Sequence, residues 1–170
     1  SVSADEFKRS LGLDKKKIVL FVGKFSAVEC TMDLVRLLEK TVQLVPEVVL
    51  VLIGDGPQRI EIESYVRSHK LGDHVVITGW IPHDDVPNWI SIADVCVLPR
   101  REDMPSARFY SPHSVRKVGE YLSLGKTVIA TPVGEFAQTD LPIVAVPLRE
   151  FPEAIERVLR EPVVTSKPKD

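Results

Sequence analysis

Residues 48–57 read Val48-Val49-Leu50-Val51-Leu52-Ile53-Gly54-Asp55-Gly56-Pro57. Six consecutive apolar residues, four of them β-branched, run directly into a glycine, an acid and a second glycine. A short, continuously apolar run is typical of a strand that is buried on both faces of a parallel sheet. Glycine after such a strand either serves a tight turn or lets a ligand approach the backbone closely. The sequence therefore predicts a buried parallel strand over residues 48–53.

Similar runs recur along the chain and alternate with amphipathic segments. Helices are expected over residues 3–11, 32–40, 57–69, 84–92 and 151–160, and from Ser111-Pro112 to a stop at Gly125. Strand and helix in alternation, with short connections, predict an α/β fold: a Rossmann-like, doubly wound parallel sheet with helices on both faces. We expect one domain over residues 1–160 and a disordered tail over 161–170. The expected strands are residues 18–22, 48–53, 75–78, 95–98, 127–130 and 143–146.

Composition limits the possible partners. The 22 basic and 24 acidic residues give a net charge of −2, so no broad cationic face is expected and nucleic acid is not a predicted partner. Any phosphate binding must therefore be local. Neither the two cysteines nor the four scattered histidines have metal-ligand spacing, and we expect no metal. No apolar run approaches the roughly 20 residues of a membrane span, and no secretory signal is visible, which favours a cytoplasmic protein.

Glycine directly follows three of the expected strands, at Gly23, Gly54 and Gly79. In an open parallel sheet, ligands bind outside the carboxyl ends of the strands. Each glycine alone is accounted for by a tight turn, whereas three at one edge favour a binding site. The candidate binding residues at this edge are Gly23, Lys24, Gly54, Gly56, Gly79, Trp80 and Ile81.

The helix expected from Ser111 carries the second set of candidates. Serine followed by proline is a strong helix start, and the free amides of a helix N-terminus bind phosphate. Lys117 and Glu120 lie one turn apart on this helix and share a face. The lysine can neutralise a phosphate, and the carboxylate can accept hydrogen bonds from a ribose diol. The alternative is a solvated i,i+3 ion pair without function.

Five pieces of sequence follow one another along the chain: residues 22–24, 53–57, 76–82, 92–99 and 117–131. In this order they resemble the donor domain of the group 1 retaining glycosyltransferases. The resemblance extends from about residue 11 to residue 160 and implies the GT-B architecture, in which two Rossmann-like domains face each other. This chain is similar to the C-terminal, nucleotide-sugar-binding domain, and the resemblance implies that the N-terminal acceptor-binding domain is missing from it.

The resemblance also implies an activity. It implies transfer of a hexose, mannose or glucose, from a donor such as GDP-mannose, UDP-glucose or ADP-glucose, with retention and without metal or other cofactor. The acceptor would belong to polysaccharide or glycolipid biosynthesis. The isolated domain is expected to be inactive, and any peripheral contact with the cytoplasmic membrane face would be made through the missing half. The sequence predicts no oligomeric state.

Carried over by position, Gly23 and Lys24 would face the diphosphate, and residues 79–82 would border the base. The amides near Ser114 and Val115 would cradle the phosphates. Glu120 would hold the ribose hydroxyls. The candidate catalytic residues are therefore Lys24, Lys117 and Glu120.

Several positions depart from the family pattern. Lys24 stands where the family often has arginine, which keeps the charge but loses the bidentate fork. Glu29 and Cys30 stand at the places of a lysine and a glycine, and Pro112 at that of a glutamate. Glutamate near a diphosphate is repulsive. These departures leave open a non-catalytic regulatory or scaffolding domain. A sugar-nucleotide epimerase is a weaker third alternative, because no matching histidine and acidic groups are visible.

Overall fold

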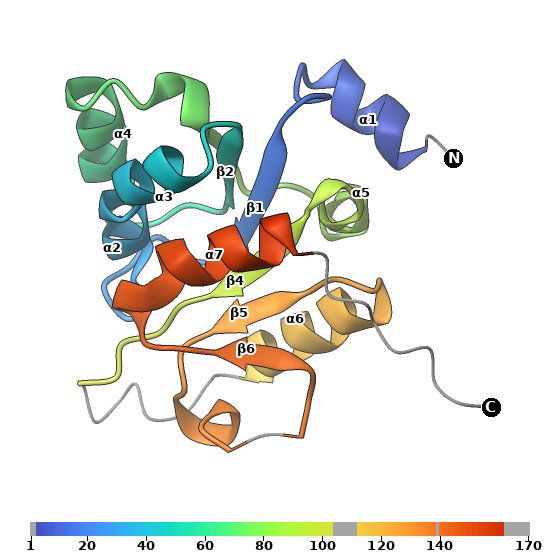
Figure 1. The fold of residues 1–170 in the computed structure, drawn as a ribbon. Coiled ribbons are helices and arrows are strands. Elements are labelled where there is room, and N and C mark those ends of the chain that lie inside the picture. The colour runs from blue at the N-terminus through green and yellow to red at the C-terminus, as the bar shows by residue number, and fades with distance from the viewer. Residues whose placement is uncertain (1–2, 104–111, 139, 162–170) are drawn as a thin grey trace.

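The computed structural model describes residues 3–103, 112–138 and 140–161, and it contains one six-stranded parallel sheet (Figure 1). The strand order is β3-β2-β1-β4-β5-β6, so the winding direction reverses between β1 and β4. The predicted Rossmann-like, doubly wound sheet is confirmed. The strands are β1 (Lys17–Val22), β2 (Val48–Ile53), β3 (Val75–Gly79), β4 (Val95–Leu98), β5 (Val128–Ala130) and β6 (Ile143–Ala145).

Helices cover both faces of the sheet. One face packs against α2, α3, α4 and α7, and the other against α5 and α6. Side chains of β1 alternate between these faces. Phe21 packs on the side of α2, α3, α4 and α7, and Leu20 packs on the side of α5 and α6; both are at most 2% exposed. Burial on both faces explains why the strands are apolar at every position. The helices are α1 (Ala4–Ser10), α2 (Thr31–Arg36), α3 (Leu38–Leu44), α4 (Arg59–Ser68), α5 (Val86–Ile92), α6 (Pro112–Ser123) and α7 (Phe151–Arg160).

One helix prediction is wrong in detail. The single helix expected over residues 32–40 is two helices, α2 and α3, which meet at Leu37, and the second extends to Leu44. Other boundaries agree: Ser3 caps α1 by accepting a hydrogen bond from the Glu6 amide at 3.2 Å, and α7 spans residues 151–160. The predicted cap Ser111 and the expected tail from residue 162 lie outside the described residues.

The N-terminal helix packs on the helix that follows β3. The ring of Phe7 in α1 meets that of Trp89 in α5 edge to face, with 5.3 Å between the ring centroids. No helix among the residues described has the length and apolar character needed to cross a bilayer.

Asp94 joins the segment before β4 to the central strand. Its Oδ2 accepts a hydrogen bond from the Ile18 amide at 2.7 Å, and its own amide donates to the Ile18 carbonyl at 2.9 Å. Asp94→Ala would leave the buried Ile18 N–H without its acceptor. We expect it to lower the free energy of unfolding by about 1–3 kcal/mol in urea denaturation. The exposed Asp14→Ala is the control, with an expected change within about 0.5 kcal/mol. Equal losses in the two variants would contradict this role.

Candidate functional site

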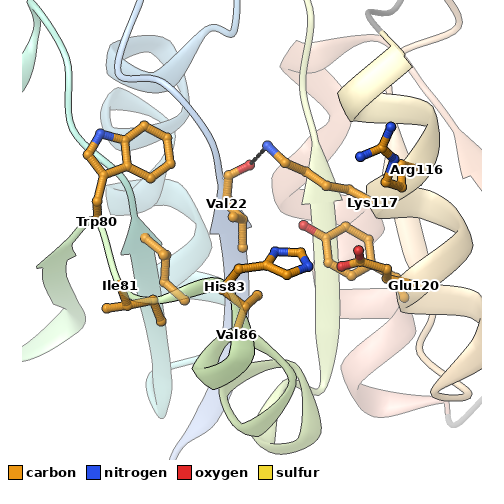
Figure 2. A pocket seen from close by; sticks show the side chains of 10 residues that line it. Val22, Trp80, Ile81, His83, Val86, Arg116, Lys117 and Glu120 are labelled. Carbon is orange, nitrogen blue, oxygen red and sulfur yellow. Dashed lines mark hydrogen bonds between the residues drawn. The ribbon is translucent and has the colours of Figure 1, made fainter.

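A cavity of about 340 Å³ opens at the carboxyl ends of β1 and β2, whose last residues Val22 and Ile53 line it. One wall is the segment after β3, which leads into α5. The other wall is the part of α6 from Arg116 to Tyr121. Figure 2 shows Lys117 and Glu120 on one side and Trp80 and Ile81 on the other. The wall residues are Trp80, Ile81, His83, Val86, Arg116, Lys117, Glu120 and Tyr121. Four residues that the sequence singled out, Trp80, Ile81, Lys117 and Glu120, are therefore brought together.

Lys117 reaches from α6 to the end of β1. Its Nζ donates a hydrogen bond to the Val22 carbonyl at 2.7 Å, drawn in Figure 2. Burial lowers the pKa of Lys117, and the nearby Glu29 and Glu120 carboxylates oppose that shift. An ammonium group carries three N–H donors, so this contact leaves donors that can face an anion in the cavity.

Glu120 lies one turn beyond Lys117 on the same helix. Figure 2 shows its carboxylate directed across the cavity toward His83. Lys117 and Glu120 do not form a salt bridge with each other in the described part of the chain. The alternative of a solvated i,i+3 ion pair therefore does not match the structure. Both side chains are half-buried and line the same cavity.

Trp80 stands at the rim of the cavity with 62% of its surface exposed. An exposed indole at a cavity mouth presents a flat apolar face to a ligand. His83 lies further along the same wall. In the sequence it is one of four scattered histidines without metal-ligand spacing, and a single histidine in a turn predicts no site. Its place four residues after Gly79, at the sheet edge, was the one available signal.

Two of the glycines predicted to bind a ligand, Gly54 and Gly56, lie against protein backbone. A Cβ at Gly54 would lie 1.8 Å from the Gly23 carbonyl oxygen, and a Cβ at Gly56 would lie 2.7 Å from the Phe25 nitrogen. The Phe25 amide in turn donates to the Asp55 carbonyl at 2.9 Å. Glycine at 54 and 56 thus allows the loop after β2 to pack on the loop after β1.

Other candidates lie outside the lining of the cavity. Lys24 is exposed on the loop after β1, and Gly79, with a φ of +74°, makes the turn that aims Trp80. Val115 is 44% exposed in the first turns of α6. Ser114 belongs to the same helix, and its side chain lies outside the described part of the structure.

The site also contains buried polar atoms. Tyr121 is 1% exposed, and its hydroxyl has no hydrogen-bond partner among the described residues. Burial raises the pKa of Tyr121 well above its usual value, so this side chain is neutral. Glu29 behaves similarly, since burial raises the pKa of its carboxyl group despite the nearby positive charge of Lys117.

Comparison with known families identifies the family of the chain. The model of the family Glycosyl transferases group 1 matches residues 16–161, which include the whole sheet and every residue that lines the cavity. The chain belongs to this family. This glycosyl transferase chain is 30% identical over 136 residues to the alpha-D-kanosaminyltransferase of Streptomyces kanamyceticus. The alignment covers 75% of the chain but only 35% of that enzyme.

Solved structures of other proteins share the fold. Anabaena Alr3699/HepE, in complex with UDP and glucose, superposes with a TM-score of 0.74 over 93% of this chain and 42% of its own, at 18% identity. The C-terminal domain of the group 1 family protein LpcC from Francisella tularensis also gives a TM-score of 0.74, at 16% identity. It matches 95% of this chain and 84% of its own. At these identities the likeness establishes the fold.

Proposed function

We propose that this chain holds the nucleotide-sugar donor of a retaining glycosyltransferase that transfers a hexose, mannose or glucose, to an acceptor bound by a separate domain. The observation that carries the proposal is the meeting of the Lys117 ammonium group and the Glu120 carboxylate in one cavity at the carboxyl edge of the sheet. A cation for a diphosphate and a carboxylate for a ribose diol are the two groups that a sugar nucleotide requires. The UDP complex of Alr3699/HepE supports a nucleotide ligand for this fold.

In the proposed complex, Glu120 accepts hydrogen bonds from the ribose hydroxyls, and the base lies against Trp80 and Ile81. The diphosphate lies between Lys117, the side chain of Lys24 and the first amides of α6, near Ser114 and Val115. As the sugar bond breaks, negative charge builds up on the departing diphosphate, and the two ammonium groups stabilise that charge. Closure against the acceptor domain would exclude water from the reaction.

We further infer that protein cations take the place of a metal ion at the diphosphate. Within residues 3–103, 112–138 and 140–161, no group of three or more histidine, cysteine, aspartate or glutamate side chains is arranged to hold a metal. Donor binding is then expected to be the same with and without EDTA.

The direct test is calorimetric titration of the 170-residue chain with UDP, GDP and ADP, with EDTA present. One of the three is expected to bind in the micromolar to millimolar range. No heat from any of them at millimolar concentration would overturn donor binding. That result would favour the regulatory or scaffolding alternative, which stays open because Glu29 stands where the family often has lysine.

Glu120→Gln is expected to remove the recognition of ribose. The neutral amide is a weaker acceptor than the carboxylate, and a hydrogen bond to a charged group contributes about 1.5–3 kcal/mol. We expect the affinity for the best-bound nucleoside diphosphate to fall about tenfold or more in calorimetry. The 2′-deoxy form of the same nucleotide is the control, because it lacks one hydroxyl and should lose much less. Equal losses for both nucleotides would show that Glu120 does not contact the ribose.

A further inference from the structure

Glu29 lies in the loop between β1 and α2, two residues before α2 begins. Both of its carboxylate oxygens pack against Gly23, so closely that a Cβ at residue 23 would lie 3.1 Å from each of them. Val22, the preceding residue, accepts the hydrogen bond from Lys117. The carboxylate is therefore next to the ammonium group proposed to bind the donor diphosphate.

Cations from three parts of the fold surround this carboxylate. They are Lys117 on α6, Arg100 after β4 and Lys24 on the same loop, and the Lys24 backbone amide also donates a hydrogen bond to it. Tyr121 of α6 also senses Glu29, and burial keeps its hydroxyl neutral. The free chain thus holds a carboxylate whose charge is offset by its neighbours.

The surroundings of Glu29 nevertheless suit a protonated carboxyl group. Its Oε2 is buried and has no hydrogen-bond partner among the residues described. Burial raises the pKa of Glu29 above the usual 4.5, and the attraction of Lys117 only partly offsets this. An ionised oxygen without a donor in a buried position is costly, whereas a neutral one costs less.

A bound diphosphate would remove what keeps Glu29 charged. The diphosphate would accept hydrogen bonds from the ammonium groups of Lys117 and Lys24, and it would bring two negative charges close to the carboxylate. Like charges that share a site raise the pKa of a carboxyl group strongly. We propose that Glu29 takes up one proton from solvent when the diphosphate of a nucleotide-sugar binds beside Lys117, so that donor affinity rises as the pH falls.

This inference rests on the proposed function and adds the direction in which donor affinity changes with pH. The pKa of Glu29 is higher in the complex than in the free chain, so protonation favours the complex. Affinity is then lowest well above the bound-state pKa, increases as the pH falls below it, and levels off below the free-state pKa. The sequence could suggest only repulsion at this position. Proton uptake relieves that repulsion.

The test is calorimetric titration of the whole chain with UDP-glucose or GDP-mannose, whichever binds, between about pH 6 and pH 8. A nucleotide-sugar is used because its diphosphate has no proton that titrates in this range, whereas a free nucleoside diphosphate does. Two buffers with different ionisation heats report the protons taken up. We expect net uptake that increases toward pH 6, and binding roughly threefold or more tighter at pH 6 than at pH 8.

Glu29→Gln is the deciding variant, because it keeps the shape of the side chain and cannot titrate. It should lose the proton uptake, bind equally at all pH values, and bind at pH 8 at least as tightly as the parent chain. Glu6→Gln, at an exposed carboxylate in α1, should behave like the parent. His83→Gln removes the histidine that lines the cavity and should retain the uptake.

Each outcome has a consequence. Undiminished uptake in Glu29→Gln, or uptake lost in His83→Gln, would overturn the assignment to Glu29. Binding that is independent of pH in the parent chain would overturn this inference alone. Absence of any nucleotide binding would overturn the proposed function, and this inference with it. If Glu29→Gln failed to fold, as thermal melting would show, absence of uptake in the parent chain or its loss in His83→Gln would still overturn the inference.

Discussion

Lys117→Met is expected to weaken nucleotide-sugar binding by roughly ten- to a hundredfold while the chain stays folded. Methionine keeps the length and apolar stem of lysine but removes the ammonium group, which is half-buried at the end of β1 and donates to Val22. Charge-assisted hydrogen bonds of this kind contribute about 1.5–3 kcal/mol each. The effect is expected in the dissociation constant measured by calorimetry.

Lys126→Met provides a matched control. Lys126 follows α6 and also donates to backbone carbonyls, those of Ser91 at 2.9 Å and Ala93 at 3.0 Å. It does not line the cavity beside Trp80. The control should lower the melting temperature without a change in nucleotide affinity. If both variants lost affinity equally, or if Lys117→Met lost only stability, the ammonium group of Lys117 would have no direct part in binding.

Gly54→Ala is expected to destabilise the chain by about 3 kcal/mol or more, a large fraction of the roughly 5–15 kcal/mol that stabilises an ordinary domain. The added Cβ would lie 1.8 Å from the Gly23 carbonyl oxygen, and the φ of +144° is itself unfavourable for alanine. Neither loop can yield easily, because the Gly54 amide donates to the Gly79 carbonyl at 3.1 Å and the Gly23 amide to the Ile53 carbonyl at 2.9 Å. Urea denaturation or a thermal melt measures the loss.

Gly119→Ala is the same substitution at a permissive position. Gly119 is exposed within α6, and a Cβ there would meet nothing within 4 Å. Alanine is a better helix former, so a gain of about 0.5–1 kcal/mol is expected. If Gly54→Ala remained within about 1 kcal/mol of the parent chain, glycine at residue 54 would be there for a ligand and not for packing between loops.

The sheet could be predicted from the sequence because its signal is local. A strand buried on both faces must be apolar at each position, and residues 18–22 and 48–53 meet that requirement without reference to any other part of the chain. The break between α2 and α3 has no such signal. No glycine or proline marks Leu37, where the break occurs. The second helix packs against α7, more than a hundred residues later in the sequence, and such a contact cannot be read from the sequence of the helix itself.

The residues of the candidate site also fall into two groups, those with a local sequence signal and those whose role depends on distant partners. Lys117, Glu120 and Trp80 were found because each lies beside a feature with a sequence signature, a helix start or a glycine after a strand. Glu29 was interpreted only as a departure from a family pattern. Its significance depends on Arg100 and Lys117, which the fold brings to it from two other elements. The charge of a side chain is visible in the sequence, whereas the partners that balance it are known only after folding.

The edge-to-face contact between Phe7 and Trp89 bears on how this protein should be cut for experiments. The family match begins at residue 16, so a recombinant fragment trimmed to that boundary would omit α1. Trp89 would then lose its aromatic cover, and α5, whose first residue Val86 belongs to the wall opposite Glu120, would lose an outer support. Fragments for ligand screening should therefore retain the first helix.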